Sequence, residues 1–194
     1  MSAKLCRMTA CLGIAAALLS LPAGSSASDN FYGVVSQTKL TAPEMATAKA
    51  SGVGSVRLTV SADVVAPNRG HFDWTQLDQS VAAASEAGLT LLPAFYGSTS
   101  WLSSDYRTMP ADADSLAQWD LMLTKAVRRY GSRGTFWDEN PGLPRNPITL
   151  WQIWNEPNAK WFAIQPISAS RYANLLIESA KTIRAEDDQA RILT

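Results

Sequence analysis

Two periods of apolar and polar positions alternate along this chain. Residues 55–60 switch between apolar and polar at every step, as a strand with one buried face does. Residues 170–186 instead repeat apolar positions three and four apart, as one face of a helix does. Strands are predicted at residues 31–36, 55–60 and 89–96, in a segment that ends at residue 156, and at 190–194; helices are predicted at 41–52, 73–87, 115–130 and 170–186. This alternation of strands and helices predicts one α/β domain built on a parallel sheet.

The length of the chain limits how much of a barrel it can form. A full (β/α)8 TIM barrel takes roughly 250 residues, or about 31 for each strand and its helix. Residues 28–194 therefore hold about five such units, and no shift in composition indicates a second domain. We expect an α/β fold of the TIM-barrel type that stops after about the fifth strand.

The first 27 residues have the pattern of a secretory signal peptide. Lys4 and Arg7 supply positive charge, residues 11–21 are apolar, and residues 25–27 form a small-residue cleavage pattern. The apolar run is too short to span a membrane comfortably. We therefore predict a mature domain of residues 28–194 that is secreted, in the extracellular or periplasmic space, and that is not bound to a membrane after cleavage.

Composition excludes several classes of function. Both cysteines, Cys6 and Cys11, lie in the predicted signal peptide, so the mature domain has no disulfide and no thiol nucleophile. Subtracting the signal's two cations from seventeen leaves fifteen basic against seventeen acidic residues, which gives no indication of nucleic-acid binding. The one histidine, His71, and the scattered carboxylates match no common metal-ligand spacing, and no phosphate-binding glycine loop is present. We expect neither a metal nor a cofactor.

The predicted strand that ends in Asn155-Glu156-Pro157 brings a carboxylate to the carboxyl end of the sheet. Pro157 lacks an N–H and ends the strand. Counting alternate positions places Gln152, Trp154 and Glu156 on one face. We assign this face to the barrel interior, because Gln152 would find no hydrogen-bond partner among the apolar helices outside. Asn155 must then reach the same site through the turn.

A carboxylic acid in this position can donate a proton to a bound substrate or accept one from it. The indoles that flank Glu156 in the sequence would lower the local dielectric, and the amide of Asn155 offers both a donor and an acceptor to a substrate hydroxyl. The sequence therefore indicates a candidate acid/base at Glu156.

The predicted second strand has one polar face. Val56, Leu58 and Val60 lie on one side, whereas Arg57 and Thr59 lie on the other. A guanidinium inside a barrel needs a carboxylate partner, because an unpaired buried charge is very costly. Arg57 is therefore expected to face an acidic group.

The segment from Trp151 to Asn158, together with residues 131–137, resembles the clan A glycoside hydrolases, in particular their family-39-like and family-5-like members. The resemblance implies a (β/α)8 barrel and a retaining β-glycosidase that hydrolyses O-glycosidic bonds of an oligo- or polysaccharide. It implies that Glu156 is the general acid/base, that Asn155 binds the 2-hydroxyl, and that Arg57, at the end of strand two, orients the nucleophile. The nucleophile of this clan is a glutamate at the end of strand seven, so we expect it beyond residue 194, in an enzyme of which this chain is the N-terminal part.

Aromatic residues near the predicted rim are candidates for substrate binding. Trp154 and Trp161 lie near the rim at strand four, where an indole serves either packing or a sugar. Trp101 and Tyr96 follow strand three, where active-site loops of this fold lie. His71 follows strand two and is either a surface residue or part of a sugar subsite.

Structural explanations compete with the functional ones. Glu156 could be a carboxylate that begins a helix, and Arg57 could belong to a structural ion pair or be solvated at a strand end. The alternative function is a non-catalytic barrel that binds carbohydrate. A carbohydrate is the expected partner in both cases, and the oligomeric state stays open.

Overall fold

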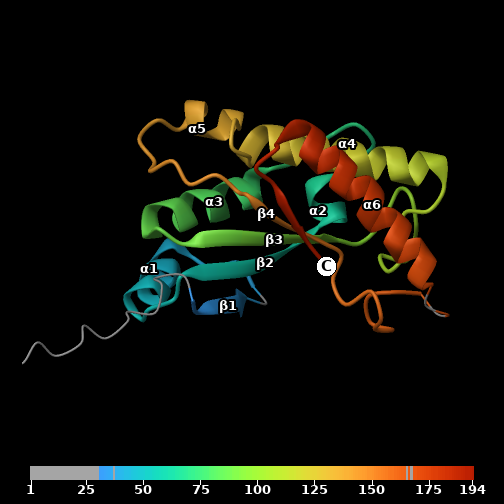
Figure 1. Cartoon of the computed structure of the whole chain (residues 1–194), viewed down its shortest axis with the longest axis horizontal. Helices are drawn as coiled ribbons and strands as arrows, with labels where there is room; N and C mark the ends of the chain where they lie inside the picture. The colour runs from blue at the N-terminus through green and yellow to red at the C-terminus, as the bar shows by residue number, and fades with distance from the viewer. Residues whose placement is uncertain (1–30, 37, 165, 167) are drawn as a thin grey trace, which may run out of the picture.

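A computed structural model describes residues 31–36, 38–164, 166 and 168–194, and the signal peptide predicted at residues 1–27 lies outside them (Figure 1). The described residues form a parallel five-stranded sheet in the order β1-β2-β3-β4-β5. The strands are β1 (Gly33–Ser36), β2 (Ser55–Ser61), β3 (Thr90–Tyr96), β4 (Leu150–Ile153) and β5 (Arg191–Leu193). Strands that follow one another in chain order and in parallel are the arrangement of successive units in a TIM barrel, so the predicted fold class is confirmed.

Helices connect the strands, as the pattern predicted. They are α1 (Ala42–Ala50), α2 (Ala62–Val65), α3 (Thr75–Ala87), α4 (Ala113–Tyr130), α5 (Thr135–Glu139) and α6 (Ala169–Glu186). The four long helices confirm the four that the periodicity predicted. The short α2 and α5 were not predicted, because helices of four and five residues are too short to show a period of 3.6.

Local sequence signals explain where the helices begin and end. The side chain of Thr41 accepts a hydrogen bond from the backbone of Glu44, and the Glu44 carboxylate bonds back to the backbone of Thr41, which completes the predicted capping box. Gly88 ends α3 in the left-handed conformation with φ at 64°. Asp112 accepts hydrogen bonds from the first turn of α4.

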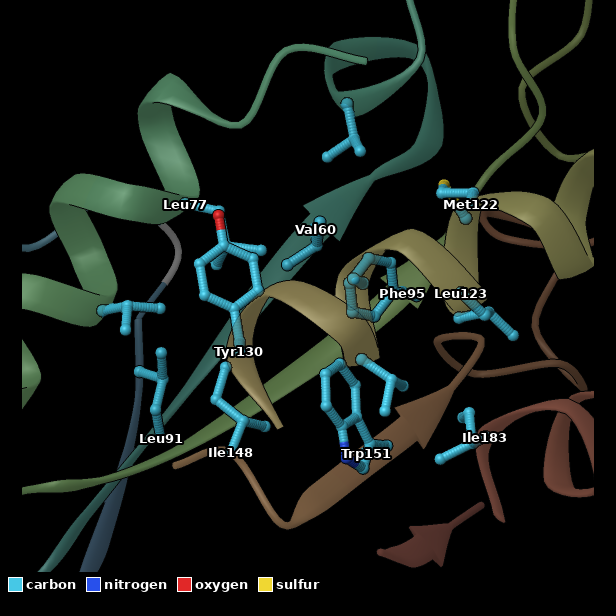
Figure 2. Packing of buried hydrophobic residues seen from close by; sticks show 14 of the residues in the cluster. Val60, Leu77, Leu91, Phe95, Met122, Leu123, Tyr130, Ile148, Trp151 and Ile183 are labelled. Atoms are coloured by element: carbon cyan, nitrogen blue, oxygen red, sulfur yellow. The ribbon is translucent and has the colours of Figure 1, made fainter. Parts of the chain in front are cut away.

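The hydrophobic core lies between one face of the sheet and the helices (Figure 2). Trp151 of β4 is fully buried and its ring stacks on Phe95 of β3 at 6.0 Å, as expected for packing between a barrel and its helices. Trp119 of α4 donates its indole N–H to the hydroxyl of Ser179 in α6, with a distance of 2.9 Å. The two longest helices are therefore joined by a buried hydrogen bond as well as by apolar contacts.

The other face of the sheet carries the polar positions. Val56 and Val60 of β2 are buried in the core, whereas Arg57 is half-buried and Thr59 is exposed. Val35 of β1 pairs with Arg57 and is 56% exposed. This face corresponds to a barrel interior, so the prediction that Arg57 and Thr59 lie opposite the helices is confirmed.

Candidate active site

The backbone changes direction directly after β4. Trp151 and Ile153 are buried on the helix side, and Gln152 lies on the polar face, as the alternation predicted. Trp154 then adopts a φ of 68°, which is unusual for a residue with a side chain. This left-handed step interrupts the alternation, so that Trp154 stays on the helix side and Asn155 joins Gln152.

Arg57 is the centre of the polar cluster that results. Its Nε donates a hydrogen bond to Oε1 of Gln152, and its Nη2 donates one to Oδ1 of Asn155, both at 2.7 Å. None of the ion pairs within the described part of the chain includes Arg57. The carboxylate partner expected for Arg57 is therefore not among these residues, and amide oxygens bind the guanidinium instead.

Arg57 differs from its expected place along the strand. It is the third of the seven residues of β2, so the expectation that it stands at the carboxyl end of its strand is wrong. Its long side chain nevertheless reaches Asn155, which lies beyond the end of β4. The guanidinium therefore arrives at the carboxyl end of the sheet although its Cα does not.

Glu156 is exposed and follows Asn155 with a φ of 42°. The next helix, α6, begins at Ala169 with Ser168 as its N-cap, so Glu156 does not begin a helix. A turn follows instead, in which the N–H of Ala159 donates to the carbonyl of Glu156 at 2.9 Å. The explanation of Glu156 as a helix-start carboxylate is therefore excluded.

The indoles near Glu156 do not enclose it. Trp154 has no exposed surface, its ring lies 5.8 Å from that of Trp119, and its N–H donates to the carbonyl of Phe162 at 2.8 Å. The expectation that Trp154 lines the substrate site is corrected: the left-handed step at this residue directs its ring into the core. Trp161, by contrast, is 65% exposed.

Tyr96 is the last residue of β3 and Trp101 lies in the loop after it, and both already contact other residues of the protein. Trp101 is half-buried, and its N–H donates to the carbonyl of Ala66 while Arg69 lies 4.9 Å from its ring centroid. Tyr96 is half-buried and meets Phe162 edge to face at 5.8 Å. Among the residues that the structure describes, no hydrogen bond or ring contact links Trp101 or Tyr96 to the Arg57 cluster, so their role in binding stays a prediction.

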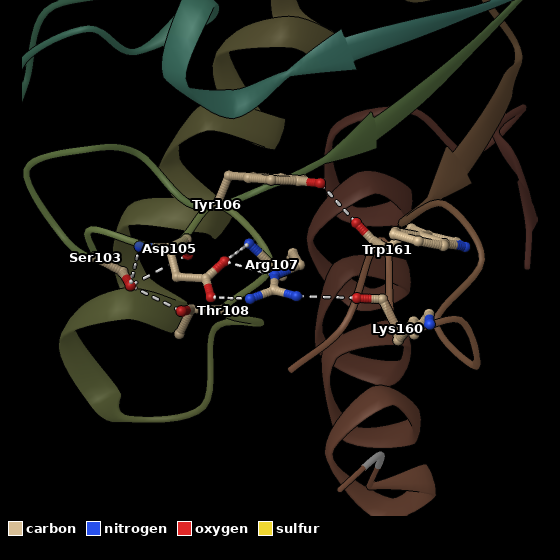
Figure 3. Close-up of polar contacts among 7 residues, drawn as sticks. All are labelled: Ser103, Asp105, Tyr106, Arg107, Thr108, Lys160 and Trp161. Carbon is tan, nitrogen blue, oxygen red and sulfur yellow. Dashed lines mark hydrogen bonds and ion pairs between the residues drawn. The ribbon is translucent and has the colours of Figure 1, made fainter. Parts of the chain in front are cut away.

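Contacts between the loops after β3 and β4 were not predicted from the sequence (Figure 3). Tyr106 donates its hydroxyl to the carbonyl of Trp161 at 2.7 Å, and Arg107 Nη1 donates to the carbonyl of Lys160 at 3.1 Å. The side chains of Arg107 and Asp105 are also paired. The spacing of Asp105 and Arg107 was the only sequence signal, and it indicates a local pair without revealing the distant partners.

A cavity of about 180 Å³ lies between β2 and helices α1 to α3. Its lining includes Thr59, Ser61, Asp73 and Tyr96, but neither Arg57 nor Glu156. His71 is exposed and its backbone pairs with Asn68. Within residues 31–36, 38–164, 166 and 168–194, no group of three His, Cys, Asp or Glu side chains is arranged to hold a metal ion, and no helix could cross a membrane.

Comparison with known proteins gives a likeness of structure. No protein-family model and no curated protein matches the chain. A family 39 glycoside hydrolase from the gut symbiont Bacteroides cellulosilyticus WH2 has a TM-score of 0.61 and 19% identity, over 84% of this chain and 30% of that one. A family 30 subfamily 8 xylanase from Clostridium acetobutylicum has a TM-score of 0.57 and 14% identity, over 84% and 40%. GH5_18 from Bifidobacterium longum has a TM-score of 0.52 and 21% identity, over 73% and 35%.

These proportions define how far the likeness extends. The chain spans about a third of the length of the family 39 and GH5_18 structures and 40% of the xylanase. A structural likeness at sequence identities this low establishes a shared fold alone. A fold by itself does not establish an activity. The chain has the fold of part of the barrel that these clan A glycoside hydrolases share.

Proposed function

We propose that this chain carries the acid/base part of a retaining β-glycosidase that hydrolyses O-glycosidic bonds of an oligo- or polysaccharide. The observation that carries this proposal is the hydrogen-bonded cluster of Arg57, Gln152 and Asn155 directly before Glu156. Catalytic groups of parallel α/β barrels lie at the carboxyl ends of the strands, where this cluster meets Glu156. The shared fold with glycoside hydrolases supports the reaction class.

Glu156 would act twice in such a reaction. Its carboxyl donates a proton to the glycosidic oxygen as a carboxylate nucleophile attacks the anomeric carbon and the bond to the leaving group breaks. The resulting carboxylate of Glu156 then takes a proton from water, which attacks the same carbon and releases the nucleophile. Both steps require access for a leaving group and for water, and the exposed position of Glu156 provides it.

Arg57 and Asn155 would hold the other reacting groups. Because Oδ1 of Asn155 accepts from Arg57, the amide orientation is set, and its Nδ2 is the atom that can donate to a 2-hydroxyl. Amide partners leave the positive charge of Arg57 unneutralised. That charge would keep a nearby carboxylate ionised, which is the form a nucleophile needs, and we place this nucleophile beyond residue 194.

We also propose that the protein is exported, on the strength of the charged start, the apolar run and the small residues before Ser28. Its substrate would then be an extracellular or periplasmic carbohydrate. The exported protein would carry no membrane anchor from this signal once it is cleaved.

The test is a Glu156→Ala variant of the full-length protein that contains this chain. Aryl β-glycosides with poor leaving groups should lose activity by about 10²-fold or more, because general acid catalysis contributes factors of that order. Dinitrophenyl glycosides, whose leaving group needs no proton, should lose much less in the first step. Added azide should restore turnover and give a β-glycosyl azide.

A matched control is Glu86→Ala, which removes an exposed glutamate from α3 and should change nothing. If Glu156→Ala hydrolyses every substrate at the wild-type rate, Glu156 is not the acid/base. If the wild-type protein binds polysaccharide but cleaves none of these substrates, the non-catalytic alternative holds instead.

A further inference from the structure

The loop after β3 and the loop after β4 are joined at the carboxyl end of the sheet, where side chains of the first donate hydrogen bonds to backbone carbonyls of the second (Figure 3). From the loop after β3, Tyr106 donates to the carbonyl of Trp161 at 2.7 Å. From the same loop, Arg107 donates to the carbonyl of Lys160 at 3.1 Å. Two consecutive carbonyls of the loop after β4 are therefore held by consecutive residues of the loop after β3, and we name these four residues the inter-loop cluster.

Asp105, in the same loop as Tyr106 and Arg107, holds the inter-loop cluster in place. Asp105 accepts from Nε and Nη2 of Arg107 at 2.9 and 2.6 Å, and also from its backbone N–H at 3.0 Å. The hydrogen bonds from Arg107 lower the pKa of the Asp105 carboxyl to about 2. The carboxylate therefore stays ionised above that pH, and it keeps the guanidinium fork oriented towards Lys160.

The cluster positions one exposed indole. The ring of Trp161 points away from Tyr106 and Arg107 and is 65% exposed, so the cluster holds the backbone and leaves the ring accessible (Figure 3). The ammonium of Lys160 lies 4.6 Å from the ring centroid, which is within the range of a cation–π contact. Single exposed apolar residues are common and need no explanation. An exposed ring whose backbone is anchored by another loop is pre-organised, which lowers the entropy cost of binding a ligand.

Trp161 also lies close to Glu156 along the chain. They are five positions apart, and turns shorten that path, because Ala159 donates to the carbonyl of Glu156 at 2.9 Å and Phe162 donates to the carbonyl of Ala159 at 3.0 Å. Along the chain, Asn155 of the Arg57 cluster directly precedes Glu156, and Trp161 follows it in the loop after β4. If Arg57 holds the nucleophile, the leaving group that Glu156 protonates would rest away from Arg57, where the loop with Trp161 can reach it.

We propose that Trp161 and Lys160 form a binding subsite for the sugar on the leaving-group side of the scissile bond, and that Tyr106 and Arg107 are its positioning residues. The apolar face of a pyranose stacks on the indole, and the ammonium of Lys160 leaves its place over the ring to donate to the hydroxyls of the sugar. This inference rests on the proposed function, since Glu156 defines which side is the leaving-group side.

The test compares two substrates with the same glycone in the full-length protein. A β-glycosyl fluoride has a leaving group too small to reach Trp161, whereas a β-linked trisaccharide of the same sugar places a ring there. Gluco, xylo, manno and galacto pairs are screened for the best glycone. Trp161→Ala should raise KM for the trisaccharide roughly two- to tenfold, the range of one aromatic contact, and leave fluoride hydrolysis unchanged.

Further variants separate positioning from general structure. Arg107→Met should also raise the KM for the trisaccharide and leave kcat for the fluoride unchanged. Arg107→Lys should bring the trisaccharide KM part of the way back to the wild-type value. Tyr32→Ala removes an aromatic that is 63% exposed just before β1, and it should have no effect on either substrate. The subsite is overturned if Trp161→Ala and Arg107→Met lower kcat/KM equally for the trisaccharide and the fluoride. It is also overturned if neither variant changes the trisaccharide KM.

A binding assay distinguishes this proposal from the proposed function. If the wild-type protein cleaves nothing, affinity electrophoresis in gels that contain xylan, glucomannan or β-glucan still reports on Trp161. Retardation of the wild type that is lost in Trp161→Ala would keep the sugar subsite while the glycosidase proposal fails. Absence of both cleavage and retardation overturns the subsite as well.

Discussion

Replacing Arg57 with methionine separates a functional arginine from a structural one. Arg57 donates two hydrogen bonds to amide oxygens, and hydrogen bonds to a charged group contribute about 1.5–3 kcal/mol each. The half-buried guanidinium forms no ion pair with a carboxylate of the described residues, and holding such a charge costs several kcal/mol. The two effects oppose one another. We therefore expect the free energy of unfolding of Arg57→Met to stay within about 1–2 kcal/mol of the wild type.

Arg129→Met is the matched comparison. Arg129 is also half-buried, but it forms a bidentate pair with Asp78 at 2.8 Å and contacts Glu139 at 3.0 Å. Removing it leaves Asp78 without its cation, which costs about 3–5 kcal/mol for a fully buried pair. The side chains of Arg129 and Asp78 are 21% and 29% exposed, so solvent screening reduces this and we expect about 2–4 kcal/mol.

Both variants are measured in the full-length protein that contains this chain, by urea unfolding followed with tryptophan fluorescence and by hydrolysis of an aryl β-glycoside. Arg57→Met should keep its stability but lose about 10²-fold in kcat/KM, the scale of a misplaced reacting group. Arg129→Met should lose stability and keep most activity at temperatures where it is folded. If Arg57→Met is destabilised as much as Arg129→Met and remains active, Arg57 is structural and the site assignment fails.

Three further predictions concern processing, the helix interface and the completeness of the barrel. Exported protein should begin at Ser28, and N-terminal sequencing that finds Met1 on a folded product would contradict the signal peptide. Burial between α4 and α6 raises the pKa of the Asp120 carboxyl, with the charge of Glu178 adding to it and a hydrogen bond from Thr182 opposing it. A raised carboxyl pKa favours folding below the unfolded value near 3.8 and disfavours it as pH rises through the folded value. Asp120→Asn should therefore raise the free energy of unfolding at pH 7 by less than about 1 kcal/mol and leave it unchanged near pH 3. A lower free energy of unfolding at pH 7 would refute the reasoning. Residues 28–194 expressed alone should be inactive and prone to aggregation, because β1 and β5 are the edge strands of the sheet that the described residues form. Sugar release above that of a Glu156→Gln control would contradict this.

The sequence was sufficient for the features that depend on neighbouring residues. The period of two in β2 and the apolar spacing of α6 show directly in the order of residues, so both elements were predicted within one or two positions. The capping box at Thr41 and the glycine after α3 were equally local signals. The placement of Gln152 on the polar face followed from strand alternation and from the cost of burying an amide among apolar helices.

Only the tertiary structure decided which of the polar and aromatic residues meet. Strand alternation predicted that Trp154 and Glu156 share a face. The left-handed backbone at Trp154 interrupts this alternation, and no residue near Trp154 in the sequence predicts that conformation. The bond from Arg57 to Asn155 joins residues 98 positions apart, and the bond from Tyr106 to Trp161 joins residues 55 apart. Contacts of this kind depend on how strands and loops are brought side by side, which is set by the packing of the whole sheet against its helices and not by any local pattern.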